Sequence, residues 1–531
     1  MNRIVTRLLL PLLMLSLALA ACGGAATPTT PSGAEATAAP APPTAAPAPP
    51  TAAPAPPTAE QPTAAAAAPT QETAPTTEAP TEAANPTPTP IVIVDPNAVK
   101  ADPNKVQVRW FVGLGTGTDP NQVELEQKVV EQFNASHPKI QLILEVVTYN
   151  AAIDTLSTEL ASGNPPDIVG PVGVSGANAF FGQWLDLSEL IKKTNYDVNQ
   201  FDKGAVEFYK AGGEGQVGLP FAIYPSMLYY QRALFDEAGL KYPPHKYNEQ
   251  YVMPDGKQVE WNYDTVAQIA KILTVDEQGK DATEQGFDPQ KITQYGFVHQ
   301  YQDLRAMGSY WGADSLVEQD GKTVRIPPQW VESWKWHYDG MWNSHFIPTS
   351  PVIQSPAFGA GDPFHSGKVA MALTHLWYSG GLEDTDNKWD IAVVPSHGGK
   401  VTANFNADTF RVFKTTKHPD ETFEVLTYLI GEASAQLLDV YGGMPARKGD
   451  QQAFFDGLNA KFPQKVDWQV AIDGIAYADI PSFEGYMPNY NEANDRLAKL
   501  QSLMEGTPGL DLDKEIATLK ADLQTIFNKK S

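Results

Sequence analysis

The segment VQVRWFV at residues 106–112 opens the stretch that decides the fold. Its β-branched and aromatic residues predict a strand. A helix is expected over residues 119–136, because apolar residues recur every three or four positions, and a second strand over residues 140–147. Another helix is expected over residues 151–162, and a third strand begins at residue 165. This β-α-β-α-β order predicts an α/β fold with a parallel sheet that helices cover on both faces.

The loop after the first strand reads GLGTGT, residues 113–118. Ligands of such sheets bind beyond the carboxyl ends of the strands, so this loop and the loop after Val169 matter most. A dinucleotide site is not expected, since Thr118 replaces the third glycine of that motif and the second strand ends without an acidic residue. We expect a loop whose backbone approaches a ligand; a merely flexible loop is the alternative.

The N-terminus has the pattern of an export signal. A short basic stretch with Arg3 and Arg7 precedes an apolar run over residues 8–20, which is too short to span a bilayer comfortably. Small residues then lead to Cys22, and this arrangement resembles the lipobox of bacterial lipoproteins. It implies a signal peptide over residues 1–21 and acylation of Cys22. Because Cys22 is the only cysteine, no thiol remains for a disulfide, a metal site or a nucleophile.

A stalk is expected over residues 22–100. It consists largely of Ala, Pro, Thr and Glu, and PAPPTA recurs from Pro40, Pro47 and Pro54. Such a segment buries too little apolar surface to offset the entropy of ordering it, so we expect an extended, semi-rigid spacer. Folded structure is expected from Lys105 onward.

The net charge of -24 and the pI of about 4.7 argue against some partners. Nucleic acid needs a basic face, and anionic lipid headgroups attract basic segments. Neither is expected to bind this chain.

Motifs spread over the chain indicate its family. The longest is GQVGLPFAIYPSMLYYQRALFDEAGL at residues 215–240. Shorter ones are SGNPPDI at 162–168, FHSGKVAM at 364–371, WDIAVVP at 389–395, and the KHPDETF helix that begins at 417. In order and spacing they resemble family 1 of the extracellular solute-binding proteins of bacterial ABC importers, which includes maltose-binding protein. Gln231 stands where that family usually has Asn, and residues 402–408 lack its common glycine pair.

The resemblance implies a two-lobed periplasmic-binding-protein fold of type II, with a ligand cleft between lobes that hinge strands join. The chain should cross near residues 220–224, near Asn404 and again near residues 442–445. The implied N-lobe comprises residues 105–222 and 404–444. The implied C-lobe comprises residues 223–403 and 445–531, and it includes a terminal helix with the apolar stripe Leu512, Ile516, Leu519 and Leu523.

Candidate ligand contacts are aromatic and polar side chains at the expected cleft. A flat ring suits the apolar face of a pyranose, and polar groups suit its hydroxyls. The aromatic candidates are Trp110, Tyr224, Trp311, Trp377 and Tyr378. The polar candidates are Asn150, Asp167, Asn404, Asn406, Asp408 and Arg447. Each has a structural alternative: Trp110 lies in a strand and could be core, Tyr224 flanks the hinge, and Asp408 could be a cap.

Neither catalysis nor metal binding is indicated. The sequence has no G-x-S-x-G and no H-E-x-x-H, and its histidines lack zinc spacing. No cofactor, metal or catalytic residue is therefore expected.

The resemblance implies a lipid-anchored, monomeric protein on the extracytoplasmic face of the cell membrane. It would capture a mono- or oligosaccharide by hinge closure and deliver it to the permease subunits of an ABC importer. The alternatives are a polyamine, a peptide or glycerol phosphate as the ligand. A surface carbohydrate-active enzyme and an adhesin are further alternatives from other functional classes.

Overall fold

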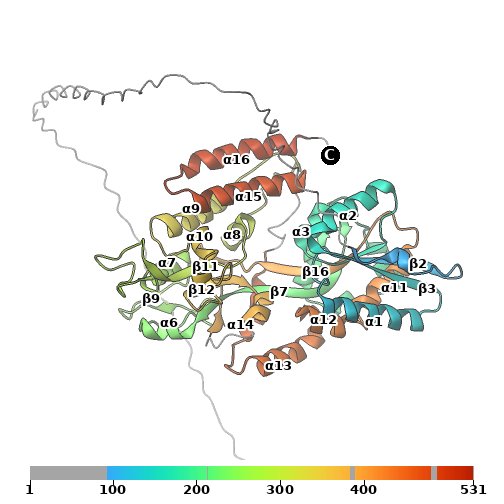
Figure 1. Cartoon of the computed structure of the whole chain (residues 1–531), viewed down its shortest axis with the longest axis horizontal. Helices are drawn as coiled ribbons and strands as arrows, with labels where there is room; N and C mark the ends of the chain where they lie inside the picture. The colour runs from blue at the N-terminus through green and yellow to red at the C-terminus, as the bar shows by residue number, and fades with distance from the viewer. Residues whose placement is uncertain (1–91, 212, 383–388, 480–486, 530–531) are drawn as a thin grey trace, which may run out of the picture. The chain divides into compact units, whose positions relative to one another are not determined.

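A computed structural model describes residues 92–529 except residues 212, 383–388 and 480–486 (Figure 1). The expected signal peptide, Cys22 and the expected stalk up to residue 91 lie outside the described residues. Within the described part, no helix combines the length and the apolar character needed to cross a membrane.

The predicted β-α-β-α-β order is confirmed. It consists of β2 (Val106–Val112), α1 (Pro120–Ser136), β3 (Ile140–Val147), α2 (Tyr149–Ser162) and β4 (Ile168–Val172). Strand β2 lies between β3 and β4 and is parallel to both. Local signals set the helix ends: a capping box between Asp119 and Gln122 begins α1, and Gly163 ends α2 in a left-handed conformation.

The fold begins earlier than the sequence indicates. The composition predicts a stalk that extends to residue 100, but Val92–Val94 form β1, which pairs antiparallel with β3, and a short 3-10 helix follows at Pro96–Ala98. Pairing occupies backbone groups of β3 that would otherwise lie at the sheet edge. A run of three β-branched residues beside a Pro-rich segment is too short to predict this strand.

Two long strands connect the halves of the central sheet. The strand order is β1-β3-β2-β4-β16-β7-β12-β11-β10, so β7 (Leu219–Gln231) and β16 (Phe405–Val412) lie at its middle (Figure 1). Strand β7 pairs with β16 through its first half and with β12 (Val369–His375) through its second. We call β7 and β16 the hinge strands, the elements around β1–β4 the N-lobe, and those around β10–β13 the C-lobe.

The N-lobe also contains helices that follow β4 and β16. They are α3 (Val174–Ala179), α4 (Ser188–Thr194), α5 (Lys203–Phe208), α11 (Pro419–Leu429) and α12 (Ser434–Tyr441). The short strands β5 (Lys210–Ala211) and β6 (Gly215–Gln216) form a separate pair, and β17 (Met444–Pro445) pairs with β7. The lobe boundaries given above stay a prediction.

The C-lobe surrounds the other half of the sheet. Its strands are β10 (Val275–Asp276), β11 (Ile292–His299), β12, β13 (Trp389–Ala392) and the two small pairs β8–β9 (Tyr251–Val252, Gln258–Val259) and β14–β15 (Ser396–His397, Lys400–Val401). Its helices are α6 (Arg232–Glu237), α7 (Tyr263–Ile272), α8 (Leu304–Tyr310), α9 (Pro328–Trp342), α10 (Ser350–Ile353), α13 (Gln451–Lys461) and α14 (Gln469–Gly474).

An antiparallel helix pair, α15 (Tyr490–Gly506) and α16 (Leu512–Phe527), packs over α8 and α9 (Figure 1). The predicted apolar stripe of the terminal helix is buried there. It joins a second core, separate from the main one, that also contains Trp330 and Trp334 of α9.

Candidate ligand-binding site

A polar stripe crosses one face of the hinge strands. On β16, Phe405 and Ala407 are buried, whereas Asn406 and Asp408 are half-buried although their strand lies in the middle of the sheet. Strand pairing sets Asn406 opposite Tyr224 of β7, and Ser226 opposite His375 of β12. Directly opposed residues share a face of the sheet, so these side chains project to the same side.

Hydrogen bonds connect the stripe across the strands. Asn406 Nδ2 donates to His375 Nε2 at 2.8 Å, and Gln302 Nε2 lies 3.4 Å from His375 Nδ1. Burial lowers the pKa of His375 to about 3, so this imidazole is neutral at physiological pH. The C-lobe end of the stripe therefore presents neutral hydrogen-bonding groups.

A row of stacked aromatic rings begins at His375, at the C-lobe end of the stripe. The Trp377 ring stacks on His375 with centroids 6.0 Å apart and an interplanar angle of 18°. The Tyr301 ring stacks on Trp377 at 6.1 Å and 28°. Tyr301 is 56% exposed and its φ of 56° is in the left-handed region, which is unusual for a tyrosine and typical of functional positions. The row offers an accessible flat apolar surface.

Tyr301 was not among the predicted contacts. It lies two residues after the end of β11, in the sequence HQYQD at residues 299–303, where loops at the carboxyl ends of strands gather. Its position just after the end of a strand was the one feature of the sequence that could have indicated a ligand contact. The predicted contact Tyr378 is buried instead, and its hydroxyl donates to Asp362 Oδ1 at 2.5 Å. Tyr378 thus orients an acidic side chain rather than offering its own ring.

Asp408 is the charged group of the stripe. Among the described residues, no side chain or backbone group donates a hydrogen bond to its carboxylate, and Oδ1 lies where a side chain at Gly173 would contact it. Burial raises the pKa of Asp408 to about 7. A desolvated carboxylate without a hydrogen-bond donor destabilises the unliganded protein. Carboxylates with a pKa shifted in this way are common in binding sites.

The glycine loop after β2 is held in place. Gln122 accepts from Gly117 N at 2.9 Å and donates to Thr116 Oγ1 at 3.0 Å. A side chain at Gly113 would meet the Val147 carbonyl at 2.6 Å, and one at Gly117 would meet Glu126 at 2.6 Å. These glycines therefore permit close packing of the loop against α1 and β3.

Several predicted contacts lie away from the stripe. Trp110 is fully buried, and its indole N–H donates to the Gly170 carbonyl at 2.6 Å. Asp167 precedes β4 at the opposite end of the strand and accepts from Arg109 N and Thr416 Oγ1. Trp311 is 7% exposed and stacks on Tyr263. In this structure these three side chains serve packing and backbone contacts.

Of the remaining candidate residues, some lie at the stripe and others lie away from it. Asn404 is fully buried, donates to the Ala306 carbonyl at 3.1 Å and accepts from Ser309, so it fixes α8 against β16. Arg447 forms an isolated backbone bridge to Phe201. Asn150 is exposed near the start of α2. The structure brings together Tyr224, Trp377, Asn406 and Asp408, of which Tyr224 is 5% exposed.

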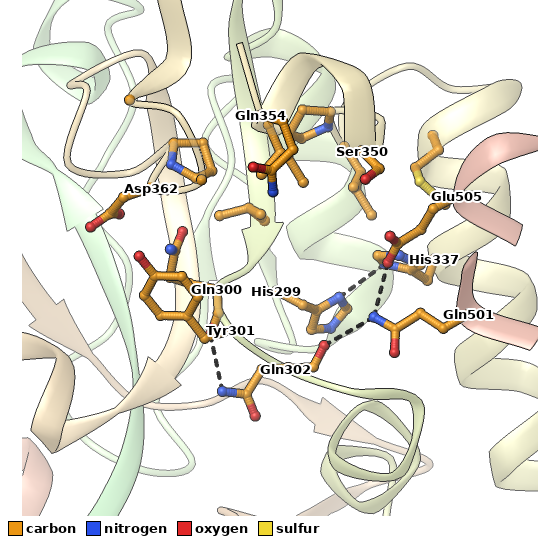
Figure 2. Close-up of a pocket in the computed structure, with 18 of the residues that line it drawn as sticks. His299, Gln300, Tyr301, Gln302, His337, Ser350, Gln354, Asp362, Gln501 and Glu505 are labelled. Carbon is orange, nitrogen blue, oxygen red and sulfur yellow. Dashed lines mark hydrogen bonds between the residues drawn. The ribbon is translucent and has the colours of Figure 1, made fainter. Parts of the chain in front are cut away.

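A pocket adjoins this site at Tyr301 (Figure 2). It has a volume of about 630 Å³, and the described residues that line it include Tyr301, Gln302 and Asp362 but no Lys or Arg. The described part of the chain contains no group of three or more His, Asp or Glu side chains placed to hold a metal ion.

This geometry can be compared with known proteins. A family model described as bacterial extracellular solute-binding protein matches residues 128–464. The chain belongs to the bacterial extracellular solute-binding proteins. The family indicated by the motifs is thereby confirmed, and its members are binding proteins that act outside the cytoplasm.

Individual relatives are distant. A Brucella abortus protein described only as a binding protein is 24% identical over 342 residues, which are 63% of this chain and 75% of the relative. The arabinooligosaccharide-binding protein of Halalkalibacterium halodurans is 22% identical over 335 residues, 61% of this chain and 69% of the relative. An ABC substrate-binding protein of Listeria monocytogenes, solved with cycloalternan, superposes with a TM-score of 0.59 at 18% identity over 80% of this chain and 100% of that chain. The superposition confirms the two-lobed α/β fold.

Proposed function

We propose that this protein binds a carbohydrate at the polar stripe and the aromatic row, and delivers it to an ABC permease. The observation that carries the proposal is the stacked row of Tyr301, Trp377 and His375 beside Asn406. An apolar ring surface next to neutral donors and acceptors matches a sugar, which has apolar C–H faces and hydroxyls at its rim.

The names of the relatives support the same ligand class. One is an arabinooligosaccharide-binding protein, and a solved neighbour from Bdellovibrio bacteriovorus holds maltotriose. A phosphate-bearing ligand would need Arg or Lys nearby, and the lining of the adjoining pocket has none among the described residues. A polyamine would use Asp362 and Asp408, and it is the competing ligand that an experiment should include.

The mechanism we propose is closure about the hinge strands. A ligand that contacts both lobes only in a closed arrangement binds that arrangement more tightly, so it shifts the population toward closure. The permease would then recognise the closed form. Acylation of Cys22 and the stalk would keep the binder at the extracytoplasmic face of the membrane.

Calorimetry on the full chain carrying Cys22→Ser, which cannot be acylated, tests the proposal. Arabinose, arabinotriose, maltose, maltotriose and spermidine are titrated in turn. Stoichiometric binding of a saccharide, without its conversion, supports the proposal. Binding of spermidine alone, or turnover of the sugar by the purified protein, contradicts it.

The matched variants are Tyr301→Ala and Tyr242→Ala. Both residues are exposed tyrosines of the C-lobe, but Tyr242 packs on Tyr230 near the end of β7 that is remote from the stripe. We expect saccharide affinity to fall in Tyr301→Ala and to stay unchanged in Tyr242→Ala. Equal affinities in the two variants would remove Tyr301 from the site.

A further inference from the structure

A buried carboxyl group lies between the glycine loop, residues 113–118, and the end of α12. Glu126 projects from α1 and is fully buried. Its Oε1 accepts a hydrogen bond of 2.5 Å from the hydroxyl of Tyr441, the last residue of α12, which packs beside α1 (Figure 1). A side chain at Gly117 would come within 2.6 Å of the same oxygen. One carboxyl group therefore lies against both segments.

Both segments lead to the candidate ligand site. The glycine loop follows the carboxyl end of β2, where ligands of such sheets bind. Tyr441 is followed by residues 442–445, in which β17 pairs with β7. A side chain at Gly443 would lie 2.8 Å from the hydroxyl of Tyr224, the β7 residue of the polar stripe. A displacement of either segment would therefore reach the ligand site.

Gln122 joins the same two segments one helical turn before Glu126. Its Oε1 accepts from Gly117 N at 2.9 Å, and its Nε2 donates to the Val440 carbonyl at 3.3 Å. Gln122 is neutral at every pH, whereas Glu126 changes its charge. Of these two links between the loop and α12, only the one through Glu126 can respond to protonation.

The surroundings of Glu126 favour its neutral form. Within the described part of the chain, its Oε1 has Tyr441 as a donor and its Oε2 has no hydrogen-bond partner. Burial raises the pKa of Glu126 to about 8, and the bond from Tyr441 opposes this effect without cancelling it. A buried carboxylate with a single donor is destabilised. The observed packing therefore suits the protonated side chain.

The titratable groups that face this pair are acidic. Burial raises the pKa of Tyr441, and Glu126, Tyr224 and Asp408 raise it further. The charged residues of the elements packed around Glu126 are exposed or paired elsewhere; they are Glu124, Lys128, Glu131 and Asp439 on the helices and Arg109 and Glu145 on the strands. An ionised Glu126 gains new donors only when the loop or the end of α12 moves aside and admits water.

We propose that Glu126 is a positioning residue of the ligand site. In its protonated form it holds the glycine loop and residues 442–445 in the arrangement that binds the ligand, and its ionisation loosens both segments. Ligand affinity then falls as the medium becomes alkaline, although Glu126 itself does not reach the ligand. This inference rests on the proposed function, because it presumes that a ligand binds at the stripe.

The dependence of affinity on pH tests this role. Calorimetry at pH 6.5 and pH 9 uses the full chain carrying Cys22→Ser, as the parent, and the saccharide that it binds most tightly. Glu126→Gln keeps the shape and the neutral state of the protonated side chain at both pH values. Glu124→Gln is the control, since Glu124 is exposed on the same helix. Asp408 is present in all three proteins, so its titration cancels when they are compared at one pH.

We expect equal affinities of the three proteins at pH 6.5. At pH 9, above the pKa of about 8, about one molecule in ten keeps Glu126 protonated, so Glu126→Gln should bind about tenfold more tightly than the other two. Tyr441→Phe removes the bond that lowers this pKa and should move the alkaline loss of affinity to higher pH. Equal affinities of the parent and Glu126→Gln at pH 9 would overturn the positioning role and leave sugar binding intact.

A measurement without ligand separates this role from the proposed function. Hydrogen exchange, corrected for its intrinsic dependence on pH, reports the opening of the glycine loop and of residues 437–445. Protection of both segments should fall between pH 6.5 and pH 9 in the parent and in Glu124→Gln, and should stay constant in Glu126→Gln. The same fall in all three proteins would overturn the role of Glu126. If no saccharide binds at either pH, the proposed function fails and this comparison alone decides on Glu126. Thermal unfolding at pH 6.5 shows that each variant folds.

Discussion

Asn406 and His375 are joined by a hydrogen bond of 2.8 Å although their strands, β16 and β12, do not pair with each other. Both strands pair with β7, which carries the backbone between the lobes. The bond therefore ties the hinge to the base of the aromatic row. A ligand that contacts Trp377 lies one ring away from the strands about which the lobes would move.

Trp377→Ala should weaken saccharide binding strongly and change stability little. Trp377 is half-buried at the surface of the main core, and loss of an aromatic face that stacks on a sugar costs about tenfold or more in affinity. Calorimetry measures the affinity and thermal unfolding measures the stability. An unchanged affinity in a folded variant would exclude Trp377 from the site.

Trp110→Phe should show the opposite pattern. The variant loses the bond from the buried indole to the Gly170 carbonyl and leaves space beside Phe410. We expect a loss of ~1–3 kcal/mol in the free energy of unfolding and no change in saccharide affinity. Chemical denaturation and calorimetry together check this. Weakened binding at unchanged stability would contradict this prediction and would indicate that Trp110 contacts the ligand, as the sequence suggested.

Asp408→Asn should stabilise the unliganded protein at neutral pH. Burial raises the pKa of Asp408 to about 7 in the folded protein, whereas an aspartate in the unfolded chain ionises near pH ~4. Between these two pH values the folded state is protonated at Asp408 and the unfolded state is not. The ionised group therefore costs stability increasingly from pH ~4 to pH ~7, and up to ~4 kcal/mol above pH 7. The variant should gain that much at pH 8 and nothing at pH 4. Denaturation curves at the two pH values measure the gain.

The same variant should bind saccharide more weakly if Asp408 contacts the ligand. Stability gained together with affinity lost is the usual pattern for a group kept for function. A variant that is more stable and binds as well as the wild type would make Asp408 a buried charge without a role in binding.

Acid should destabilise the protein through the buried histidines. The folded pKa of His337 is about 4, below the unfolded value, so the unfolded state binds the proton first. Stability is therefore lost as pH falls from ~6.5 to ~4, by about 3 kcal/mol for this ring. His337→Gln should flatten the dependence of the free energy of unfolding on pH in this window. A slope equal to that of the wild type would contradict the buried neutral pair.

The sequence predicted the features that depend on local pattern or on shared motifs. The β-α-β-α-β order followed from strand and helix periodicity, and the family followed from the segment at residues 215–240. β1 was missed because its stability comes from pairing with β3 rather than from Val92–Val94 themselves.

The burial and neighbours of the candidate site residues were harder to predict, since exposure depends on tertiary packing. Trp110 lies within β2 and Trp377 follows β12, yet the core covers only the first. Tyr301 meets Trp377, and His299 of β11 meets His337 of α9, through tertiary contacts that residue spacing does not reveal. Asn406 and Asp408 were candidates because they are polar residues beside the chain crossing that the family resemblance implies near Asn404.

A sugar should bind against the aromatic row and the hinge strands. A crystal structure of the protein with maltotriose or arabinotriose, whichever binds more tightly in calorimetry, tests it most directly. We predict a sugar ring stacked on Trp377 or Tyr301, with a hydroxyl within hydrogen-bond distance of Asn406 or Asp408. A fully occupied sugar that contacts none of these four side chains would contradict it.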